Sequence, residues 1–154
     1  MDTTTPTRAR TIPLQRLANR IVRGLLRTPL LCRLAGARLI ALYVVGRKSG
    51  KHYTLPVAYT QCDGYLLVGT PFGWGRNLRT GQPVTIRLRG KLRQADVRVV
   101  TDEAGVVADF ATMARDNHQF ATLNGIRLDA AGTPSSDDLH AAWRAGARAF
   151  RLTV

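Results

Sequence analysis

Five strand-like segments follow one another before residue 102, and the short turns between them constrain the fold more than any other feature. Each segment is rich in β-branched and aromatic residues, which favour extended backbone. Turns as tight as residues 62–64 permit only antiparallel pairing, because a parallel connection needs a dozen or more residues. Five or six strands paired in this way favour closure into a small β-barrel. The segments are residues 38–46, 52–60, 65–70, 83–89 and 92–101, and residues 149–154 form a last strand.

Helical patterns flank these strands on both sides. From residue 12 to residue 27, apolar residues recur every three or four positions and arginines fill a second stripe, which predicts an amphipathic basic helix. After the strands, acidic residues mark the first turn of a further helix, where the helix dipole favours them. The other expected helices cover residues 28–36, 101–115, a segment that ends near residue 125, and residues 135–146, which open with the capping sequence SSDD.

These elements together predict the fold class and the domain organisation. We expect an α+β protein, with a β-barrel of about six mostly antiparallel strands, an N-terminal amphipathic helix and covering helices. The length of 154 residues fits one domain. We therefore expect a flexible tail over residues 1–11 and a single domain over residues 12–154.

The chain is strongly basic. It has 23 Lys and Arg residues against 10 Asp and Glu residues, which gives a formal net charge of +13. Such a chain attracts polyanions, which include nucleic acid, anionic lipid and multiply charged cofactors. The helix over residues 12–27 has two interpretations. It packs its apolar face on the barrel, or it docks on an anionic membrane, where each arginine near the surface contributes about 1 kcal/mol.

Other features of the sequence bear on location and metal binding. Cys32 and Cys62 lack the spacing of a zinc site, so no metal is expected. The sequence contains no run of about 18 apolar residues, so no membrane-spanning helix is expected. Arginines from Arg8 to Arg23 interrupt any apolar stretch of the signal-peptide type. We therefore expect a cytoplasmic protein, either free or peripheral at the inner face of the membrane.

The sequence GRKSGK at residues 46–51 has the chemistry of a phosphate-binding loop. It offers cations, a hydroxyl and several backbone N–H groups on a tight turn. It departs from a Walker A loop, because only three residues separate Gly46 from Gly50 and His52 stands where Ser or Thr is needed. The alternative is a basic hairpin turn in which both glycines supply positive φ angles and the charges point into water.

A longer series of motifs surrounds this loop. GRKSG is followed by LPV at residues 55–57, DGY at 63–65, a strand that ends in Gly-Thr at 69–70, and WGRNLR at 74–79. The series resembles the deazaflavin (coenzyme F-420)-dependent nitroreductase and quinone reductase family. These are small split β-barrel proteins related to the flavin-binding pyridoxamine-phosphate-oxidase barrels. The resemblance covers about residues 12–101 and implies that the barrel is of the split type.

The resemblance also implies a cofactor, a reaction and a set of site residues. Coenzyme F-420 is a deazaflavin with a phosphate linker and a glutamate tail, and its reduced form transfers a hydride to a quinone, a nitro compound or an activated alkene. Flavin mononucleotide is the alternative cofactor. The implied cofactor-binding residues are Arg47, Lys48 and Ser49 at the phosphate and tail, Leu55, Pro56 and Val57 along the ring, Val68, Gly69 and Thr70 at the ring edge, and Trp74 and Asn77.

Several of these residues also have a structural interpretation. Pro56 has no N–H to donate, which suits an edge strand, and Gly69 would let a flat ring approach the backbone. Trp74 could equally cap the barrel. No catalytic residue is identified. Tyr43 and Tyr59 are weak proton-donor candidates, because packing is the commoner role of a strand tyrosine.

The alternative function is a non-enzymatic flavin, haem or nucleic-acid binding protein on the same basic barrel. Cations on adjacent strands could form a basic sheet face, but only 6% of residues are aromatic and no base-stacking motif is present, so nucleic acid is the less favoured partner. The expected partner is a small-molecule acceptor, and the oligomeric state is not predicted. The cations that could form the basic sheet face are Arg87, Arg89, Lys91, Arg93 and Arg98.

Overall fold

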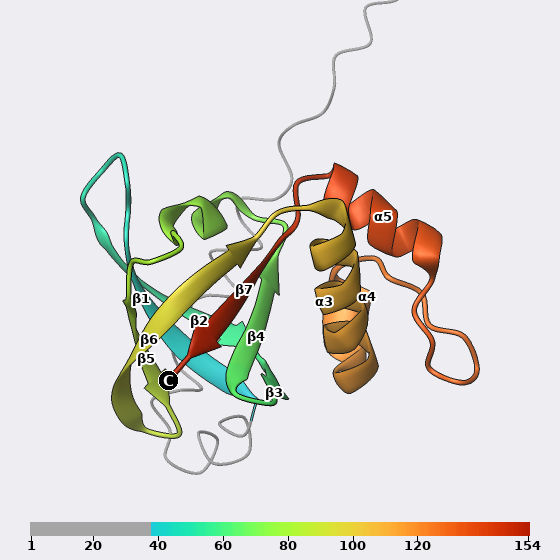
Figure 1. Ribbon diagram of the computed structural model, residues 1–154, viewed down its shortest axis with the longest axis horizontal. Helices are drawn as coiled ribbons and strands as arrows, with labels where there is room; N and C mark the ends of the chain where they lie inside the picture. Colours follow the sequence, from blue (N-terminus) through green and yellow to red (C-terminus); the bar gives the residue numbers. More distant parts are fainter. Residues whose placement is uncertain (1–37) are drawn as a thin grey trace, which may run out of the picture.

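The computed structural model describes residues 38–154, which form a curled antiparallel sheet with three α-helices on one side (Figure 1). The α+β fold class is therefore confirmed. The predictions for the tail, the basic helix over residues 12–27, the helix over residues 28–36 and Cys32 lie outside the described residues. The strands are β1 (Leu39–Val45), β2 (His52–Ala58), β3 (Thr60–Cys62), β4 (Tyr65–Thr70), β5 (Val84–Leu88), β6 (Lys91–Val100) and β7 (Arg148–Thr153). The helices are the 3-10 helix η1 (Gly73–Asn77), α3 (Glu103–Asp116), α4 (His118–Leu123) and α5 (Ser136–Arg144).

The strands pair in the order β2-β1-β5-β6-β7-β4-β3, and every pairing is antiparallel. The strand predicted over residues 52–60 is divided at Tyr59 into β2 and β3, which adds a seventh strand. These two pieces form opposite edges of the sheet although one residue separates them. The sheet must therefore curl until its edges meet, and this gives a half-barrel. Pro56 lies in the edge strand β2, as expected.

Strand β6 joins the two halves of the curled sheet. Its first half, Lys91 to Ala95, pairs with β5, and its second half, Asp96 to Val100, pairs with β7. A strand that changes partners along its length must bend and twist strongly, which is how an open sheet becomes barrel-like.

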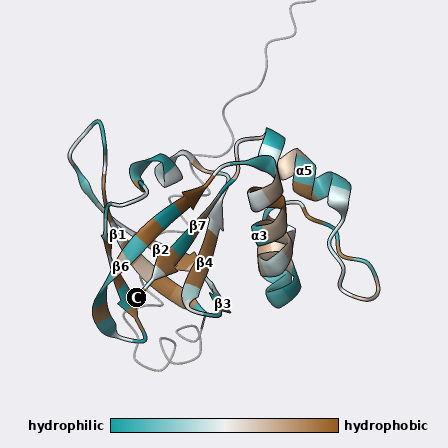
Figure 2. Cartoon of the chain, viewed as in Figure 1, coloured by the Kyte–Doolittle hydropathy of each residue, from teal (hydrophilic) through white to brown (hydrophobic). Residues whose placement is uncertain are grey.

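The sheet separates two apolar cores. Inside the curl lies a cluster from β1, β2, β4, β5, β6 and β7, and outside it a second cluster lies between β4, β7 and the helices. Strand β4 serves both, since Leu66 and Val68 point inward while Leu67 points toward the helices. Figure 2 shows hydrophobic and hydrophilic segments alternating along the strands. The inner cluster includes the fully buried Ile40, Leu42, Val68, Ile86, Phe150 and Leu152, and the outer one Leu67, Val106, Phe110 and Ala149.

Local signals in the sequence set the ends of the helices. The carboxylate of Asp102 accepts a hydrogen bond from the N–H of Gly105 and caps α3. The hydroxyl of Ser135 caps α5 in the same way, so the helix start predicted at SSDD is confirmed. The reciprocal bond of a capping box is absent, because the carboxylate of Asp138 accepts from Arg127 and the N–H of Ser135 donates to the oxygen of Arg127. Gly146 ends this last helix with a φ of 96°, which favours glycine.

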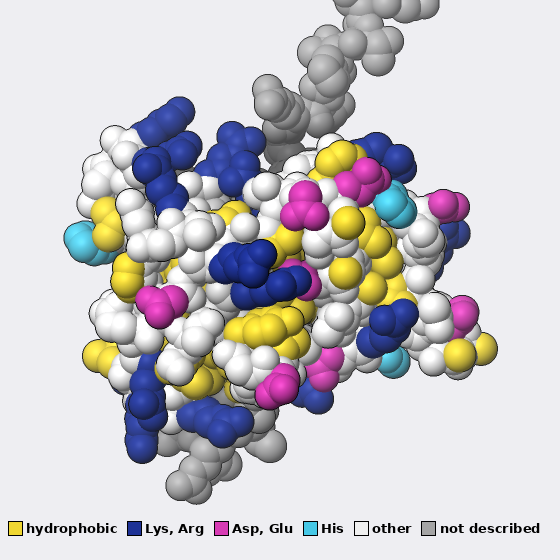
Figure 3. Space-filling model, viewed as in Figure 1, with side chains coloured by type: hydrophobic (Ala, Val, Ile, Leu, Met, Phe, Trp, Pro, Cys, Tyr) yellow, Lys and Arg dark blue, Asp and Glu magenta, His cyan; other side chains and the backbone are white. Residues whose placement is uncertain are grey.

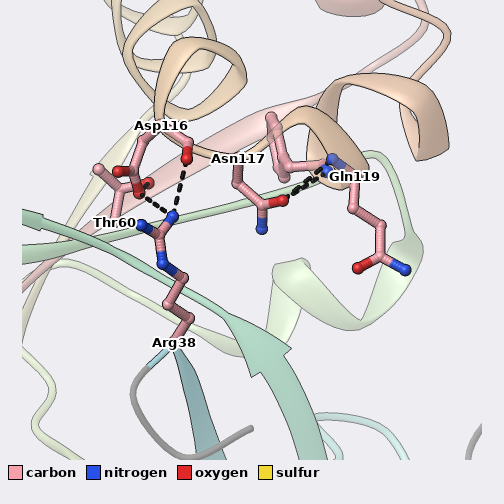
Figure 4. Close-up of polar contacts among 6 residues, drawn as sticks. Arg38, Thr60, Asp116, Asn117 and Gln119 are labelled. Carbon is pink, nitrogen blue, oxygen red and sulfur yellow. Dashed lines mark hydrogen bonds and ion pairs between the residues drawn. The ribbon is translucent and has the colours of Figure 1, made fainter. Parts of the chain in front are cut away.

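Polar contacts tie the end of α3 to the start of the sheet (Figure 4). Arg38 donates from Nη1 to the backbone oxygen of Asp116 at 2.7 Å, and Thr60 donates to the carboxylate of Asp116 at 3.0 Å. The side chain of Asn117 then accepts from the N–H of Gln119 and begins α4. Within residues 38–154 no helix is long and apolar enough to span a membrane.

Candidate functional site

A pocket of about 450 Å³ opens between the β1–β2 hairpin and η1. Two stretches of chain about thirty residues apart form it, and the side chains of Tyr53 and Leu55 on β2 add to its lining. The hairpin projects at the left of Figure 1, and η1 is the short helix above the sheet. The lining residues are Gly46, Arg47, Lys48, Ser49, Tyr53, Leu55, Gly73, Trp74, Arg76 and Asn77.

The hairpin turn is held by its own backbone. The N–H of Gly46 donates to the oxygen of Lys51 at 2.7 Å, and the N–H of Gly50 donates to the oxygen of Gly46 at 2.8 Å. Strand β2 follows the turn, so the departure from a Walker A loop is confirmed. Of the two glycines in this turn, only Gly50 has a positive φ, of 66°. Gly46 is needed for space instead, because a Cβ there would lie 2.6 Å from Oγ of Ser49 and 2.9 Å from the ring of Tyr53.

The 3-10 helix η1 is seated on the end of the barrel by close packing. A Cβ on Gly75 would lie 2.8 Å from Cγ2 of Thr70 and 2.9 Å from Cζ of Phe150, so only glycine fits. The ring of Trp74 stacks on Phe150 with centroids 6.1 Å apart. This seating leaves Trp74, Arg76 and Asn77 on the pocket side. Trp74 therefore caps the inner core and lines the pocket at the same time.

One hydrogen bond connects the two walls. The backbone N–H of Arg47 donates to Oδ1 of Asn77 at 3.0 Å. On the hairpin side, the hydroxyls of Ser49 and Tyr53 share a longer contact of 3.4 Å. The amide of Asn77 thus fixes the hairpin backbone against η1, which places the loop cations beside the aromatic wall.

The pocket is electropositive. Arg47, Lys48 and Arg76 line it, and no carboxylate does. The ion pairs among residues 38–154 use other cations: Arg38, Arg127, His140 and Arg151. Figure 3 shows Lys and Arg side chains gathered at the upper left, over the hairpin region. Cations that converge without acidic partners favour an anionic ligand, because their fields add in a concave site.

Six of the predicted cofactor residues meet at this pocket: Arg47, Lys48, Ser49, Leu55, Trp74 and Asn77. The other five do not line it. Val57 and Val68 pack into the inner core, Thr70 is buried and accepts from the N–H of Phe72, and Pro56 pairs with Ala41 in the edge strand. A direct role for these residues at a cofactor stays a prediction.

Gly69 has a structural reason to be glycine. A Cβ at this position would lie 2.6 Å from Cε of Met113 and 2.9 Å from Cε2 of Phe110. Both side chains belong to α3 and are fully buried. The missing side chain therefore lets α3 pack on β4. The sequence suggested that a ligand ring approaches the backbone at this point. The observed contacts are instead with two side chains more than forty residues further along the chain, which a local pattern does not reveal.

The two tyrosines suggested as proton donors lie away from the pocket. The hydroxyl of Tyr43 accepts from Nε of Arg87, and Tyr59 is buried in the inner core. The tyrosine that lines the pocket is Tyr53, which is 40% exposed. Alternation along β2 could have indicated it, because Tyr53, Leu55 and Val57 must share one face. Arg76 was also missed as a site residue, although the sequence places it inside the W-x-x-N motif.

The cations of β5 and β6 are divided between faces. Arg87 lies opposite Leu92, so both point to one side, and the neighbouring Arg93 lies opposite the buried Ile86 on the other side. Arg89 stands in the turn with a φ of 49°. Arg87 and Arg93 therefore lie on opposite faces of the sheet, and the nucleic-acid alternative stays a prediction.

A second polar cluster lies between the sheet and α3, away from the pocket. The buried carboxylate of Asp109 accepts two hydrogen bonds from Arg151, at 2.9 and 3.1 Å. The guanidinium of Arg151 lies 5.5 Å from the ring centroid of Tyr65. Burial raises the pKa of Tyr65, and a hydrogen bond with the side chain of Cys62 raises it further. Residues 38–154 contain no cluster of three side chains that could hold a metal ion.

Comparisons with known proteins do not assign a family. No protein-family model and no curated protein matches the chain. A solved structure of a mycobacterial split-barrel-like protein, described as a domain-swapped dimer, has a TM-score of 0.49 and 13% sequence identity. The match covers 90% of this chain and 96% of that chain. With so low an identity and TM-score, no conclusion about activity rests on this likeness.

Proposed function

We propose that the protein is an oxidoreductase that uses reduced coenzyme F-420 to transfer a hydride to a small organic acceptor such as a quinone, a nitro compound or an activated alkene. The observation that carries the proposal is the junction between the hairpin and η1. The GRKSG loop and the W-x-x-N-L segment are the two motifs that most resemble the deazaflavin family, and they form the walls of one pocket. The bond from Arg47 to Asn77 joins them directly.

The chemistry of the lining supports the proposed cofactor. A volume of about 450 Å³ lies within the usual range for small-molecule pockets. The cofactor carries negative charges on its phosphate and glutamate tail, and Arg47 and Lys48 stand on the exposed turn without acidic partners in the lining. Trp74 and Leu55 supply an apolar wall for a flat ring. The opening allows the tail to extend into solvent.

Each wall has a separate task in this proposal. Arg47, Lys48 and the hydroxyl of Ser49 bind the phosphate by charge-assisted hydrogen bonds. Asn77 holds the hairpin in place, and Trp74 positions the ring. When bound, the reduced deazaflavin supplies a hydride. The hydroxyl of Tyr53 is within the same pocket and can give a proton to the reduced acceptor, for which neither a metal nor a protein nucleophile is needed.

The proposal is tested by titrating the full chain with coenzyme F-420 and with flavin mononucleotide, following cofactor fluorescence. The double variant Arg47→Ala/Lys48→Ala should weaken F-420 binding by about 2 to 5 kcal/mol, the scale for losing charge-assisted bonds to a phosphate. Lys51→Ala is the matched control, because Lys51 lies on the same exposed hairpin and does not line the pocket. It should change the affinity much less.

The outcome distinguishes the proposal from its alternatives. Tight binding of F-420, followed by reduction of menadione or a nitroaromatic compound, supports the reductase. If flavin mononucleotide binds and F-420 does not, flavin mononucleotide is the cofactor of this pocket. If neither binds, or if Lys51→Ala weakens binding as much as the double variant does, the loop is only a basic hairpin and the proposal fails.

A further inference from the structure

The pocket has more positive charge than one phosphate group requires. Arg47 and Lys48 stand together on the hairpin, whereas Arg76 stands on η1 between Trp74 and Asn77. The three cations thus come from two separate segments of the chain. The hydrogen bond from Arg47 to Asn77 joins these segments through a backbone N–H, so it neutralises none of the three charges.

The guanidinium of Arg76 has no partner among residues 38–154. The hydrogen bonds and ion pairs of the described residues do not include its side chain. An arginine is well suited to bind a carboxylate, because its planar guanidinium can donate two parallel hydrogen bonds to it. The indole of Trp74, two residues earlier, gives an aromatic surface next to this charge.

We propose that Arg76 selects the acceptor, and that the pocket prefers flat aromatic acceptors that carry a carboxylate or another anionic group. The inference rests on the proposed function, because it assigns Arg47 and Lys48 to the cofactor and leaves Arg76 for the second ligand. The aromatic part of the acceptor lies against the face of the deazaflavin ring that Trp74 does not cover, while its anionic group receives hydrogen bonds from Arg76. Anionic nitroaromatics and quinones are therefore better ligands than neutral analogues of the same size.

Direct binding provides the first test. Calorimetry compares 4-nitrobenzoate with 4-nitrobenzyl alcohol, which has a similar size and no charge. The comparison is made with F-420-loaded protein and with the protein alone. We expect the loaded wild-type protein to bind the carboxylate about tenfold more tightly, which corresponds to about 1.4 kcal/mol. The preference should decrease as salt is raised, because the charges involved are exposed.

Two variants show which residue causes the preference. Arg76→Gln keeps hydrogen-bonding groups but removes the charge, and it should reduce the preference to below about twofold. Arg79→Gln removes the same charge three residues further along, outside the pocket lining, and should leave the preference intact. A general effect of net charge would change both variants equally, and that result overturns the proposal.

Cofactor titration separates this inference from the proposed function. If Arg76→Gln weakens F-420 binding as strongly as Arg47→Ala/Lys48→Ala does, Arg76 belongs to the cofactor site and the inference fails. If F-420 does not bind at all, the proposed function fails, and calorimetry on the protein alone decides whether Arg76 still selects anionic aromatic ligands. Equal affinity of the wild-type protein for the acid and the alcohol overturns the inference in either case.

Discussion

Replacing Gly69 with alanine tests whether this glycine serves the fold or a ligand. The new Cβ would lie 2.6 Å from Cε of Met113 and 2.9 Å from the ring of Phe110. Both side chains are fully buried in the outer core, so the Cε of Met113 and the ring of Phe110 must shift against packed neighbours. Overpacking of this kind costs about 1 to 3 kcal/mol. An alanine also lowers the conformational entropy of the unfolded chain. This stabilises the folded protein by about 0.4 to 1 kcal/mol where the backbone angles suit alanine, and it offsets part of the overpacking cost.

The net expectation is a loss of about 1 to 2 kcal/mol for Gly69→Ala, and therefore a melting temperature lower by about 2 to 8 °C for a chain of this size. Chemical denaturation followed by far-ultraviolet circular dichroism measures the loss. Gly73→Ala is the control: a Cβ there meets nothing within 4 Å and the φ angle is not positive, so its stability should be close to that of the wild type.

A double-mutant cycle identifies the contact. Met113→Ala alone should cost about 2 to 5 kcal/mol through the cavity it leaves. Because this change removes the atom nearest to the new Cβ, Gly69→Ala/Met113→Ala should be less destabilised than the sum of the single variants by about 0.5 kcal/mol or more. A Gly69→Ala protein as stable as the wild type, with weakened F-420 binding, would refute the packing argument and assign the glycine to the ligand.

Three further predictions concern the pocket and the surface. Tyr53→Phe should lower the turnover of a nitro or quinone acceptor by about a hundredfold, the usual contribution of a positioned general acid, with F-420 affinity retained; unchanged turnover in stopped-flow measurements would assign the proton to water. Asn77→Leu should raise the hydrogen-exchange rate of the Arg47 amide by about tenfold, because its acceptor is lost, and unchanged exchange would contradict the tether. Hydrogen bonds from Arg127 lower the pKa of Asp138 from 3.8 to about 2, so the stabilisation is present above pH 3.8 and is lost as the pH falls through about 2. The melting temperatures of the wild type and Asp138→Asn should therefore differ at pH 6 and converge near pH 2, and a difference that persists there would contradict the assigned cause.

Local physical chemistry made the secondary structure readable from the sequence. Runs of β-branched residues alternate with turns such as Gly64 and Gly90, whose φ angles of 82° and 81° suit glycine. Ser135 begins its helix because a side-chain hydroxyl there satisfies a free backbone N–H. Each of these signals depends on residues within a few positions of one another. For that reason the order of strands and helices after residue 38 could be predicted without knowledge of what packs against what.

The break at Tyr59 was not readable in this way. Residues 52–60 have one continuous strand pattern, and nothing in their composition marks the point where the chain leaves one edge of the sheet for the other. At the break, the side chain of Tyr59 is buried in the inner core and its N–H donates to the oxygen of Arg38, at 2.9 Å. Both interactions depend on the curl of the complete sheet.

The features of the candidate site also fall into those that the sequence determines and those that tertiary contacts determine. The sequence alone determined the cations, hydroxyl and glycines of residues 46–51 and the motif around Trp74, because these are properties of the residues themselves. Only the tertiary structure decided which of them meet. Glycine at position 75 lets η1 pack on Phe150. This packing places Asn77 within hydrogen-bonding distance of Arg47, and it also places Arg76 in the pocket lining. Packing on the same scale placed Gly69 against α3 and Tyr59 in the inner core, away from the pocket. Contacts across 30 or more residues depend on how the sheet closes, and no local pattern encodes that closure.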